Sequence, residues 1–303
     1  MKFKIKNSKI YKMILPFVLF FTLFIIVFSL YGFWSATHPP KYKTNLTPQD
    51  FEWSFQAINL TTIDNIRLSA WFVPAEKNSD KTIILLHGYP FDKANILGWA
   101  SFLHDDFNLL FFDFRYFGDS EGSMTTVGYH EQKDLASALD YLEKRSLPAG
   151  GQGFDRIGIM GFSLGGAVAI MTAAKDTRIN AVVSDSAYAN LDLVINEYYQ
   201  NLFVFKYPLS SLTKIWAKIF VGVYPSEISP QASAKNLQIP ILIIHSKKDQ
   251  VIPFENATRI KDSLKNNPRA EFLFQEEGVH GGLPEKLRQE YQEKVLKFLN
   301  KNI

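Results

Sequence analysis

A serine in a glycine-rich turn is the residue of this chain best suited to act as a nucleophile. The apolar run Arg156–Met160 predicts a short strand, which leads into Gly161-Phe162-Ser163-Leu164-Gly165 and then into small, helix-forming residues. The pattern G-x-S-x-G between a strand and a helix is typical of a nucleophile elbow, in which the glycines permit a tight turn and the serine Oγ stands clear of the backbone. The alternative is a glycine-rich turn that carries a serine by chance.

A nucleophilic serine needs a base and an acid that orients the base, and both types of residue follow it along the chain. Asp249 lies in the loop after the apolar run Pro240–His245, and His280 lies in the loop after Ala270–Gln275. Each residue therefore follows the carboxyl end of a predicted parallel strand, where catalytic groups of open α/β sheets collect. The order Ser, Asp, His is that of one group of serine hydrolases, so we predict Ser163 as nucleophile, Asp249 as acid and His280 as base.

Other residues compete for the two partner roles. Asp249 could instead cap a helix that begins near Phe254, and His280 could be an exposed loop residue. The competing acids are Asp185, Glu276 and Glu277, and the competing histidines are His38, His104, His130 and His245. Chain order and position after a strand favour Asp249 and His280 over these residues.

Backbone N–H groups that could bind an oxyanion can also be placed. The strand-like run Lys81–Leu86 ends in His87-Gly88-Tyr89-Pro90. In a nucleophile-elbow hydrolase one N–H comes from the residue after the nucleophile, here Leu164, and the other from the loop after the third strand, here Tyr89. We expect His87 to hold this loop by hydrogen bonding and not to act as the base.

Five motifs at compatible spacing carry a family resemblance. They are Leu86-His87-Gly88-Tyr89; Asp113-Phe114-Arg115-Tyr116-Phe117-Gly118-Asp119-Ser120-Glu121-Gly122; Gly161-Phe162-Ser163-Leu164-Gly165-Gly166; His245-Ser246-Lys247-Lys248-Asp249-Gln250-Val251-Ile252-Pro253; and Gly278-Val279-His280. Over residues 55–300 the chain resembles the α/β-hydrolases, in particular the Bem46-like, serine aminopeptidase-like branch of membrane-anchored or secreted hydrolases. We expect no cofactor.

The resemblance has one departure. Relatives usually have Gly at the position of Tyr116, in a loop near the site, so we expect Tyr116 to narrow the pocket. Asp113 and Arg115, in the same motif, are expected to brace the loop around the elbow.

The hydropathy pattern predicts the fold class independently of the family. Short apolar runs of the buried parallel type alternate with helical stretches, which predicts a doubly wound, mostly parallel α/β sheet. The expected parallel strands are Ile83–Leu86, Leu109–Phe114, Ile157–Met160, Ala181–Ser184, Ile241–Ile244 and Phe272–Phe274; Ile66–Val73 is expected as an antiparallel edge strand. The expected helices include Tyr129–Lys144, Leu164–Lys175, Glu255–Leu264 and Glu285–Asn300.

One long stretch interrupts this alternation. Residues 187–236 follow the sixth strand and are rich in large apolar and aromatic residues, including Tyr198, Tyr199, Phe203, Phe205, Trp216 and Phe220. We predict a cap of two or three helices over the active site. Its aromatic residues either contact an apolar acyl or alkyl group of the substrate or seat the cap on the main domain.

The N-terminus predicts attachment to a membrane. Residues 13–34 carry no charge and are long enough to cross a hydrocarbon core of about 30 Å. Residues 1–12 hold five lysines and no acid, which predicts a cytoplasmic N-terminus and an extracytoplasmic catalytic domain. A cleaved signal peptide is the alternative, but the run is longer than usual and no A-x-A site follows. We expect a tail at 1–12, an anchor at 13–34, a linker at 35–54 and a hydrolase domain at 55–303.

Composition excludes several function classes. The chain has no cysteine, which excludes disulfides and thiol catalysis. Without the five lysines of the tail the formal charge of +3 becomes −2, so the basic tail is a topology signal and not a nucleic-acid site. No metal-ligand spacing or phosphate-binding loop stands out.

These patterns together predict a serine hydrolase that cleaves a small-molecule or lipid ester with an apolar acyl group. The same triad could hydrolyse a thioester or a peptide bond, because a fold does not fix the substrate. A catalytically inactive, membrane-tethered binding module is the alternative from another class. The sequence does not define the oligomeric state.

Overall fold

The computed structural model describes residues 8–146 and 156–303, which form two compact units. The first, called here the sheet unit, comprises Thr37–Leu191 and Ser226–Ile303. The second, called the helical unit, comprises Met1–Ala36 and Asp192–Pro225. The expected basic tail at 1–12 lies largely outside the described residues.

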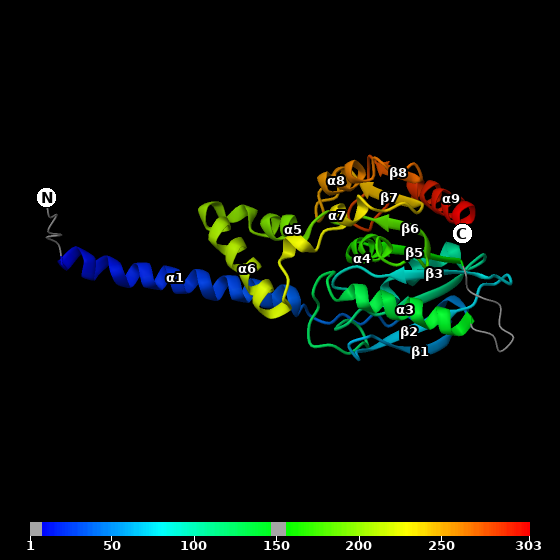
Figure 1. Ribbon diagram of the computed structural model, residues 1–303, viewed down its shortest axis with the longest axis horizontal. Coiled ribbons are helices and arrows are strands. Elements are labelled where there is room, and N and C mark those ends of the chain that lie inside the picture. Colours follow the sequence, from blue (N-terminus) through cyan, green and yellow to red (C-terminus); the bar gives the residue numbers. More distant parts are fainter. Residues whose placement is uncertain (1–7, 147–155) are drawn as a thin grey trace. The chain divides into compact units, whose positions relative to one another are not determined.

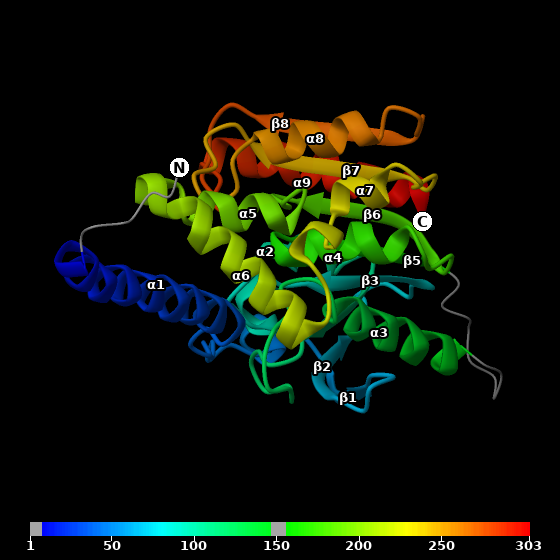
Figure 2. The ribbon, with the colours of Figure 1, turned by 60° about the vertical axis from the view of Figure 1, so that its left-hand side comes forward.

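The sheet unit is built on eight strands in the order β1-β2-β4-β3-β5-β6-β7-β8 (Figure 2). β1 pairs with β2 and β2 with β4 in antiparallel orientation, and all other neighbours are parallel. The bounds are β1 Gln56–Thr61, β2 Arg67–Val73, β3 Lys81–Leu86, β4 Asn108–Phe112, β5 Arg156–Phe162, β6 Ile179–Asp185, β7 Ile241–Ser246 and β8 Ala270–Gln275. This sheet confirms the predicted α/β-hydrolase class.

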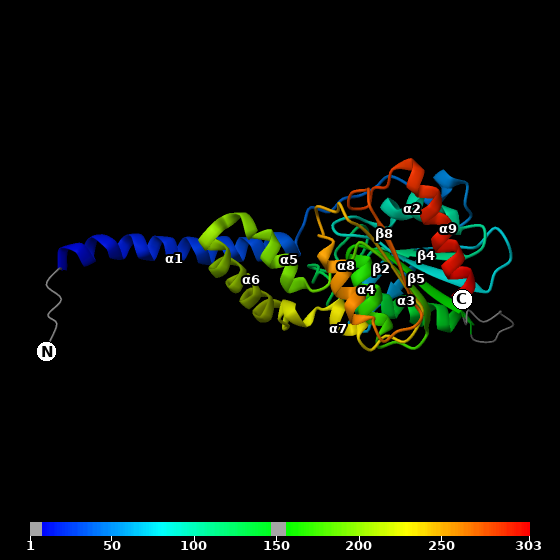
Figure 3. The ribbon, with the colours of Figure 1, turned by 90° about the horizontal axis from the view of Figure 1, so that it is seen from above.

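Helices cover both faces of the sheet (Figure 3). α2 and α9 lie on one face, and α3, α4, α7 and α8 lie on the other. The bounds are α2 Leu97–Ala100, α3 Glu131–Ser146, α4 Leu164–Ala173, α7 Pro230–Ala234, α8 Glu255–Ser263 and α9 Glu285–Asn302; short 3-10 turns are η1 Pro48–Phe51, η2 Lys93–Ile96, η3 Ser101–Leu103 and η5 Pro225–Glu227. Because both faces are covered, the central strands β3 to β7 are buried almost throughout, as their apolar runs predict.

The edge of the sheet differs from the prediction. We expect the strand at Ile66–Val73 to be an edge strand, but β1 pairs with its residues Arg67 to Phe72 and forms the edge instead. Most of β1 is exposed, with Leu60 its one buried residue. A strand that buries so little has no strong alternation of apolar and polar residues, so the sequence pattern does not reveal it.

The helical unit combines the N-terminal helix with the segment inserted after β6 (Figure 1). Its elements are α1 Ser8–Thr37, α5 Leu191–Tyr198, η4 Gln200–Phe205 and α6 Lys206–Val221. The segment Asp192–Pro225, called here the insert, is shorter than the cap expected at 187–236, because α7 belongs to the sheet unit. One stretch of α1, Tyr11–Thr37, is long and apolar enough to cross a membrane.

Candidate active site

Ser163 lies at the turn between β5 and α4. Its φ of 52° and ψ of −111° place it in a sparsely populated conformation that a side chain adopts only under constraint. The turn is tight because Gly165 packs directly against β3: a Cβ on Gly165 would lie 2.3 Å from the carbonyl oxygen of Leu86. The Ser163 N–H also donates to the carbonyl of Asp185 at the end of β6 (2.8 Å). The local chain therefore holds the serine in the geometry of a nucleophile elbow.

The structure brings Ser163, His280 and Asp249 together in one hydrogen-bonded row. His280 Nε2 lies 3.0 Å from Ser163 Oγ, and His280 Nδ1 lies 2.7 Å from Asp249 Oδ2. The Phe162 ring lies 4.8 Å from the imidazole between ring centres and limits its movement. These distances allow the imidazole to accept the hydroxyl proton while the carboxylate holds the tautomer with Nδ1–H.

The Asp249 carboxylate is buried and remains ionised. Its Oδ1 accepts the backbone N–H groups of Val251 and Ile252, both at 2.9 Å. Burial acts to raise its pKa, but hydrogen bonds from His280 and from the Ile252 N–H outweigh burial, so the pKa of Asp249 is lowered. A group that stays negative beside Nδ1 is suited to stabilise an imidazolium.

The competing acids have other partners. Asp185 accepts hydrogen bonds from Tyr291 (3.0 Å) and Ser186 (2.9 Å), while Glu276 and Glu277 form exposed ion pairs with Lys247 and Lys286. Asp185, Glu276 and Glu277 therefore lie outside the row that joins Ser163, His280 and Asp249.

The two predicted oxyanion donors belong to segments next to Ser163. Leu164 is the first residue of α4, and the first N–H groups of a helix have no partner within the helix. The loop after β3 lies beside the serine, because a Cβ on Gly88 would be 3.4 Å from the Cβ of Ser163. Tyr89 follows in this loop, and its ring packs against Phe117 at 5.9 Å between centres. The predicted donors Leu164 and Tyr89 thus belong to the two segments that flank Ser163.

Comparison with known proteins now identifies the family, since the family model described as "Prolyl oligopeptidase family" matches residues 121–303. The chain belongs to the prolyl oligopeptidase family. Among curated proteins it is similar to the uncharacterised YqkD of Bacillus subtilis, at 29% identity over 75% of this chain and 73% of that protein. It is also 24% identical to the Bem46 protein of Schizosaccharomyces pombe, over 72% of this chain and 69% of that protein. These relatives confirm a Bem46-like α/β-hydrolase.

Solved structures give the same fold. The Pyrococcus furiosus esterase Pf2001 has a TM-score of 0.72 and 27% identity, over 88% of this chain and 99% of that one. A Pyrococcus horikoshii acylaminoacyl peptidase shares the fold at a TM-score of 0.61 and 18% identity, over 86% of this chain and 44% of that one. The protein therefore has the fold of a serine hydrolase, with both esterases and peptidases among its structural neighbours.

His87 holds its loop in this hydrolase, as the sequence predicts. It is fully buried, its Nδ1 lies 2.9 Å from the carbonyl of Gly88, and its Nε2 accepts the N–H of Phe114 at 3.0 Å. Burial lowers the pKa of His87 and favours this neutral form. The residue therefore connects the loop after β3 to the loop after β4.

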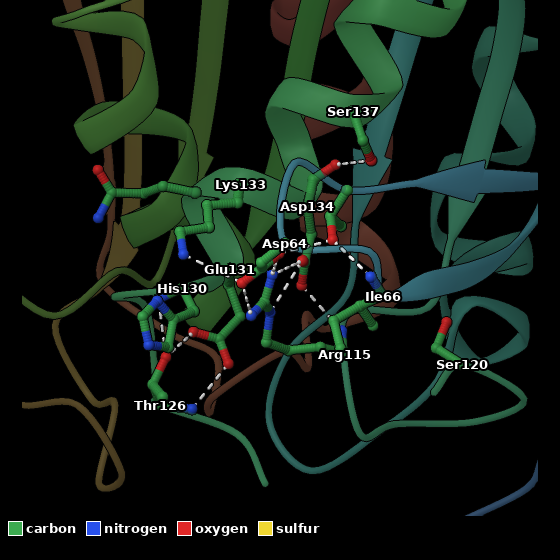
Figure 4. Close-up of polar contacts among 12 residues, drawn as sticks. Asp64, Ile66, Arg115, Ser120, Thr126, His130, Glu131, Lys133, Asp134 and Ser137 are labelled. Atoms are coloured by element: carbon green, nitrogen blue, oxygen red, sulfur yellow. Dashed lines mark hydrogen bonds and ion pairs between the residues drawn. The ribbon is translucent and has the colours of Figure 1, made fainter. Parts of the chain in front are cut away.

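Asp113 and Arg115 brace the loop after β4, which confirms their predicted structural role. Asp113 accepts the Lys93 N–H and ammonium, both at 2.7 Å. Arg115 donates to Asp134 on α3 and to Asp64 in the β1–β2 turn (Figure 4). Hydrogen bonds from Arg115 hold the pKa of Asp64 well below its usual range.

Two supporting residues were not predicted from the sequence. Glu131 is fully buried and accepts four hydrogen bonds from Thr125, Thr126 and Gly128, which fixes the loop before α3. His245 Nε2 lies 2.8 Å from the carbonyl of Ile252 and so closes the loop that contains Asp249. An acid in the first turn of a predicted helix and a histidine at the end of a predicted strand are the sequence signals that could have identified them.

Tyr116 differs from its expected role. Its φ of 73° lies in the left-handed region, which explains why a glycine would suit the position. Its hydroxyl donates to the carbonyl of Pro39 (2.9 Å), and Lys41 and His38 pack against its ring. The side chain thus holds the linker after α1; we expected it to narrow the pocket.

The part of the sheet unit behind the His280 loop contains a pocket of about 480 Å³. Its lining includes Trp99, Asp185, Ser186, Gly281 and Tyr291. In residues 8–146 and 156–303 no group of three or more His, Asp or Glu side chains could hold a metal ion.

Proposed function

We propose that the protein is a serine hydrolase that cleaves an ester bond, with Ser163, His280 and Asp249 as the catalytic residues. The observation that carries the proposal is the continuous row from Ser163 Oγ through the imidazole to the Asp249 carboxylate, at 3.0 and 2.7 Å. The 27% identity to an esterase over 88% of the chain supports an ester substrate over a peptide.

The reaction proceeds by acyl transfer to water. His280 Nε2 removes the proton from Ser163 Oγ as the oxygen attacks the ester carbonyl, and the N–H groups of Tyr89 and Leu164 stabilise the resulting oxyanion. The imidazolium then gives its proton to the leaving alkoxide, which leaves an acyl-enzyme on Ser163. Water activated by His280 hydrolyses that ester and restores the free serine.

Membrane attachment is the second part of the proposal. The apolar stretch of α1 remains as an uncleaved anchor, with the N-terminus in the cytoplasm and the hydrolase outside it. The long uncharged span and the lysine-rich tail support this orientation. The intact mass of the protein extracted from membranes tests it, because cleavage after α1 would remove more than the first 30 residues.

Labelling with a fluorophosphonate, followed by peptide mapping, tests the mechanism on the full chain in detergent. We expect Ser163 to be labelled, and Ser163→Ala to lose both the label and about 10⁴-fold or more of turnover. Folded protein that neither takes the label nor hydrolyses any substrate would support a binding module instead.

The bond type is tested with matched substrates. The same acyl group presented as a p-nitrophenyl ester, a thioester and an anilide should give the highest kcat/KM for the ester. An aminoacyl or peptidyl anilide as best substrate would favour the peptidase alternative, which the family description and the acylaminoacyl peptidase fold support. A series of ester chain lengths then tests the expected preference for apolar acyl groups.

A further inference from the structure

We propose that the insert Asp192–Pro225 lies in the lipid bilayer, in the leaflet where α1 ends, and there contacts acyl chains. This inference rests on the proposal that α1 is an uncleaved membrane anchor. It adds a second membrane-embedded element made from a segment about 160 residues further along the chain.

The insert packs directly on the last turns of α1, where the two segments lie side by side in all three ribbon views. The rings of Phe33 and Phe220 stack at 5.6 Å, and Trp216 Nε1 donates to Ser29 Oγ at 3.0 Å. A Cβ on Gly32 would lie 2.1 Å from the Tyr199 hydroxyl oxygen. The contact therefore depends on a small residue of α1 and on hydrogen bonds, as helix pairs in membranes commonly do.

The position of this contact along α1 sets its depth. Ser29 precedes Trp34, the last residue of the expected anchor, by about 8 Å along the helix axis. Half of a hydrocarbon core is about 15 Å thick. If Trp34 lies at the interface, Ser29 lies within the outer half of the core, and the insert side chains that touch Ser29 must lie there too.

Several large apolar side chains of the insert are exposed, while two of its hydroxyl side chains are buried. On α6 the exposed row includes Tyr207, Ile215 and Ile219, whereas Ser210 and Thr213 are buried. Thr213 Oγ1 forms hydrogen bonds with the Tyr199 hydroxyl (2.9 Å) and the Ser29 carbonyl (3.3 Å). A helix facing water would show the opposite pattern.

The tip of the insert is apolar and exposed. In the run Leu202-Phe203-Val204-Phe205 all four side chains are exposed, with Phe203 at 84%. Phe203 also has a φ of 46°, a conformation unfavourable for an aromatic residue, which turns the chain at this point. The two acids of the insert, Asp192 and Glu197, lie on α5, and Asp192 pairs with Lys214 at 2.9 Å. From Tyr198 to Pro225 the charged residues are three lysines, which suit a surface of anionic headgroups.

The absence of cysteine permits a direct test. Single substitutions Phe203→Cys and Ile219→Cys are labelled with an environment-sensitive fluorophore in the full chain, reconstituted in phosphatidylcholine–phosphatidylglycerol vesicles with or without doxyl-labelled acyl chains. Phe17→Cys on α1 reports anchor insertion. Ile63→Cys, an 88% exposed apolar position in the sheet unit, is the matched control.

We expect labels at residues 203 and 219 to be quenched several-fold by doxyl lipid, as at residue 17, and the label at 63 to be unaffected. Quenching at 17 with none at 203 and 219 overturns the inference while leaving the anchor in place. No quenching at 17 shows that the anchor proposal itself fails. Efficient disulfide crosslinking between copies through 203, without quenching, would assign the surface to a second copy of the chain and overturn the inference.

Discussion

Asp249 Oδ2 lies 2.7 Å from His280 Nδ1, while the other oxygen of the same carboxylate is held by two backbone N–H groups. The carboxylate can therefore neither rotate nor leave the imidazole without losing buried hydrogen bonds. This arrangement fixes the ring with Nε2 facing Ser163. The acid is thus a positioning group for the base, and its charge and its geometry can be tested separately.

Asp249→Asn should keep the side chain beside His280 Nδ1 but remove its negative charge. It should also permit the imidazole tautomer that carries its proton on Nε2, which cannot accept the Ser163 proton. We expect kcat to fall by about 10⁴-fold, with little change in KM. Steady-state kinetics on the preferred ester, with circular dichroism as a folding control, measure this. Asp185→Asn is the matched comparison: a loss as large there as at Asp249 would contradict the assignment of the acid.

Asp185 gives a prediction about stability and pH. Burial raises the pKa of Asp185 to about 6, although hydrogen bonds from Ser186 and Tyr291 oppose this shift. A carboxyl whose pKa is higher in the folded state stabilises that state when protonated, so the contribution is complete below about pH 4 and is lost as pH rises through 6. Two pKa units correspond to about 3 kcal/mol.

The free energy of unfolding of the wild type, relative to Asp185→Asn, should therefore fall by roughly that amount between pH 4 and pH 7. Urea titrations of both proteins at four pH values measure this difference in the free energy of unfolding. Other titrating groups contribute equally to both proteins, so their contributions cancel in the difference. A pH-independent difference would show that burial does not raise the pKa of this carboxyl.

The elbow predicts unequal effects for two glycines. A Cβ on Gly165 would meet the Leu86 carbonyl at 2.3 Å, and backbone on both sides must shift to admit it. We expect Gly165→Ala to lower the free energy of unfolding by at least about 2 kcal/mol and to reduce labelling of Ser163. In Gly98→Ala the nearest atom would be 3.8 Å away, so stability should stay within about 1 kcal/mol of wild type. Thermal unfolding of the two variants and the wild type measures both changes in stability.

Much of the sheet unit could be predicted because its strands are buried on both faces. The apolar runs identify β3 to β8 within a few residues, and the ends of β5, β7 and β8 place Ser163, Asp249 and His280 at one edge. Chain order then distinguishes these three from other acids and histidines. The edge strand β1 was missed, since its exposed residues carry no periodic signal.

The helical unit could not be predicted in the same way. An apolar segment after β6 indicates a helical insert, but the sequence does not show which surface it packs against. The packing roles of Gly32 and Ser29 are seen only in the folded chain, where Tyr199 lies against Gly32 and Trp216 donates to Ser29. The role of Tyr116 was missed for the same reason, because its partner Pro39 is 77 residues away in the chain.

Tyr116 should affect stability and leave the substrate preference unchanged. Tyr116→Phe removes the hydrogen bond to Pro39 and should lower the free energy of unfolding by about 0.5–1.5 kcal/mol. The kcat/KM of this variant should depend on the chain length of the ester in the same way as that of the wild type, because the Tyr116 side chain contacts the linker. A shift toward longer or bulkier acyl groups would instead support the expectation that this residue narrows the pocket.

Arg115, with two ion pairs, should be essential for stability, in contrast to Arg178, which has three. Its side chain is 6% exposed and faces the fully buried Asp134, which would be left without its charged partner by Arg115→Met. We expect a loss of about 3–5 kcal/mol, because an uncompensated charge would remain buried. Arg178 pairs with Asp140, Glu143 and Asp176 nearer the surface, so Arg178→Met should cost less than about 1 kcal/mol. Urea unfolding of the two variants decides this, and similar losses in both would show that burial does not govern the strength of these pairs.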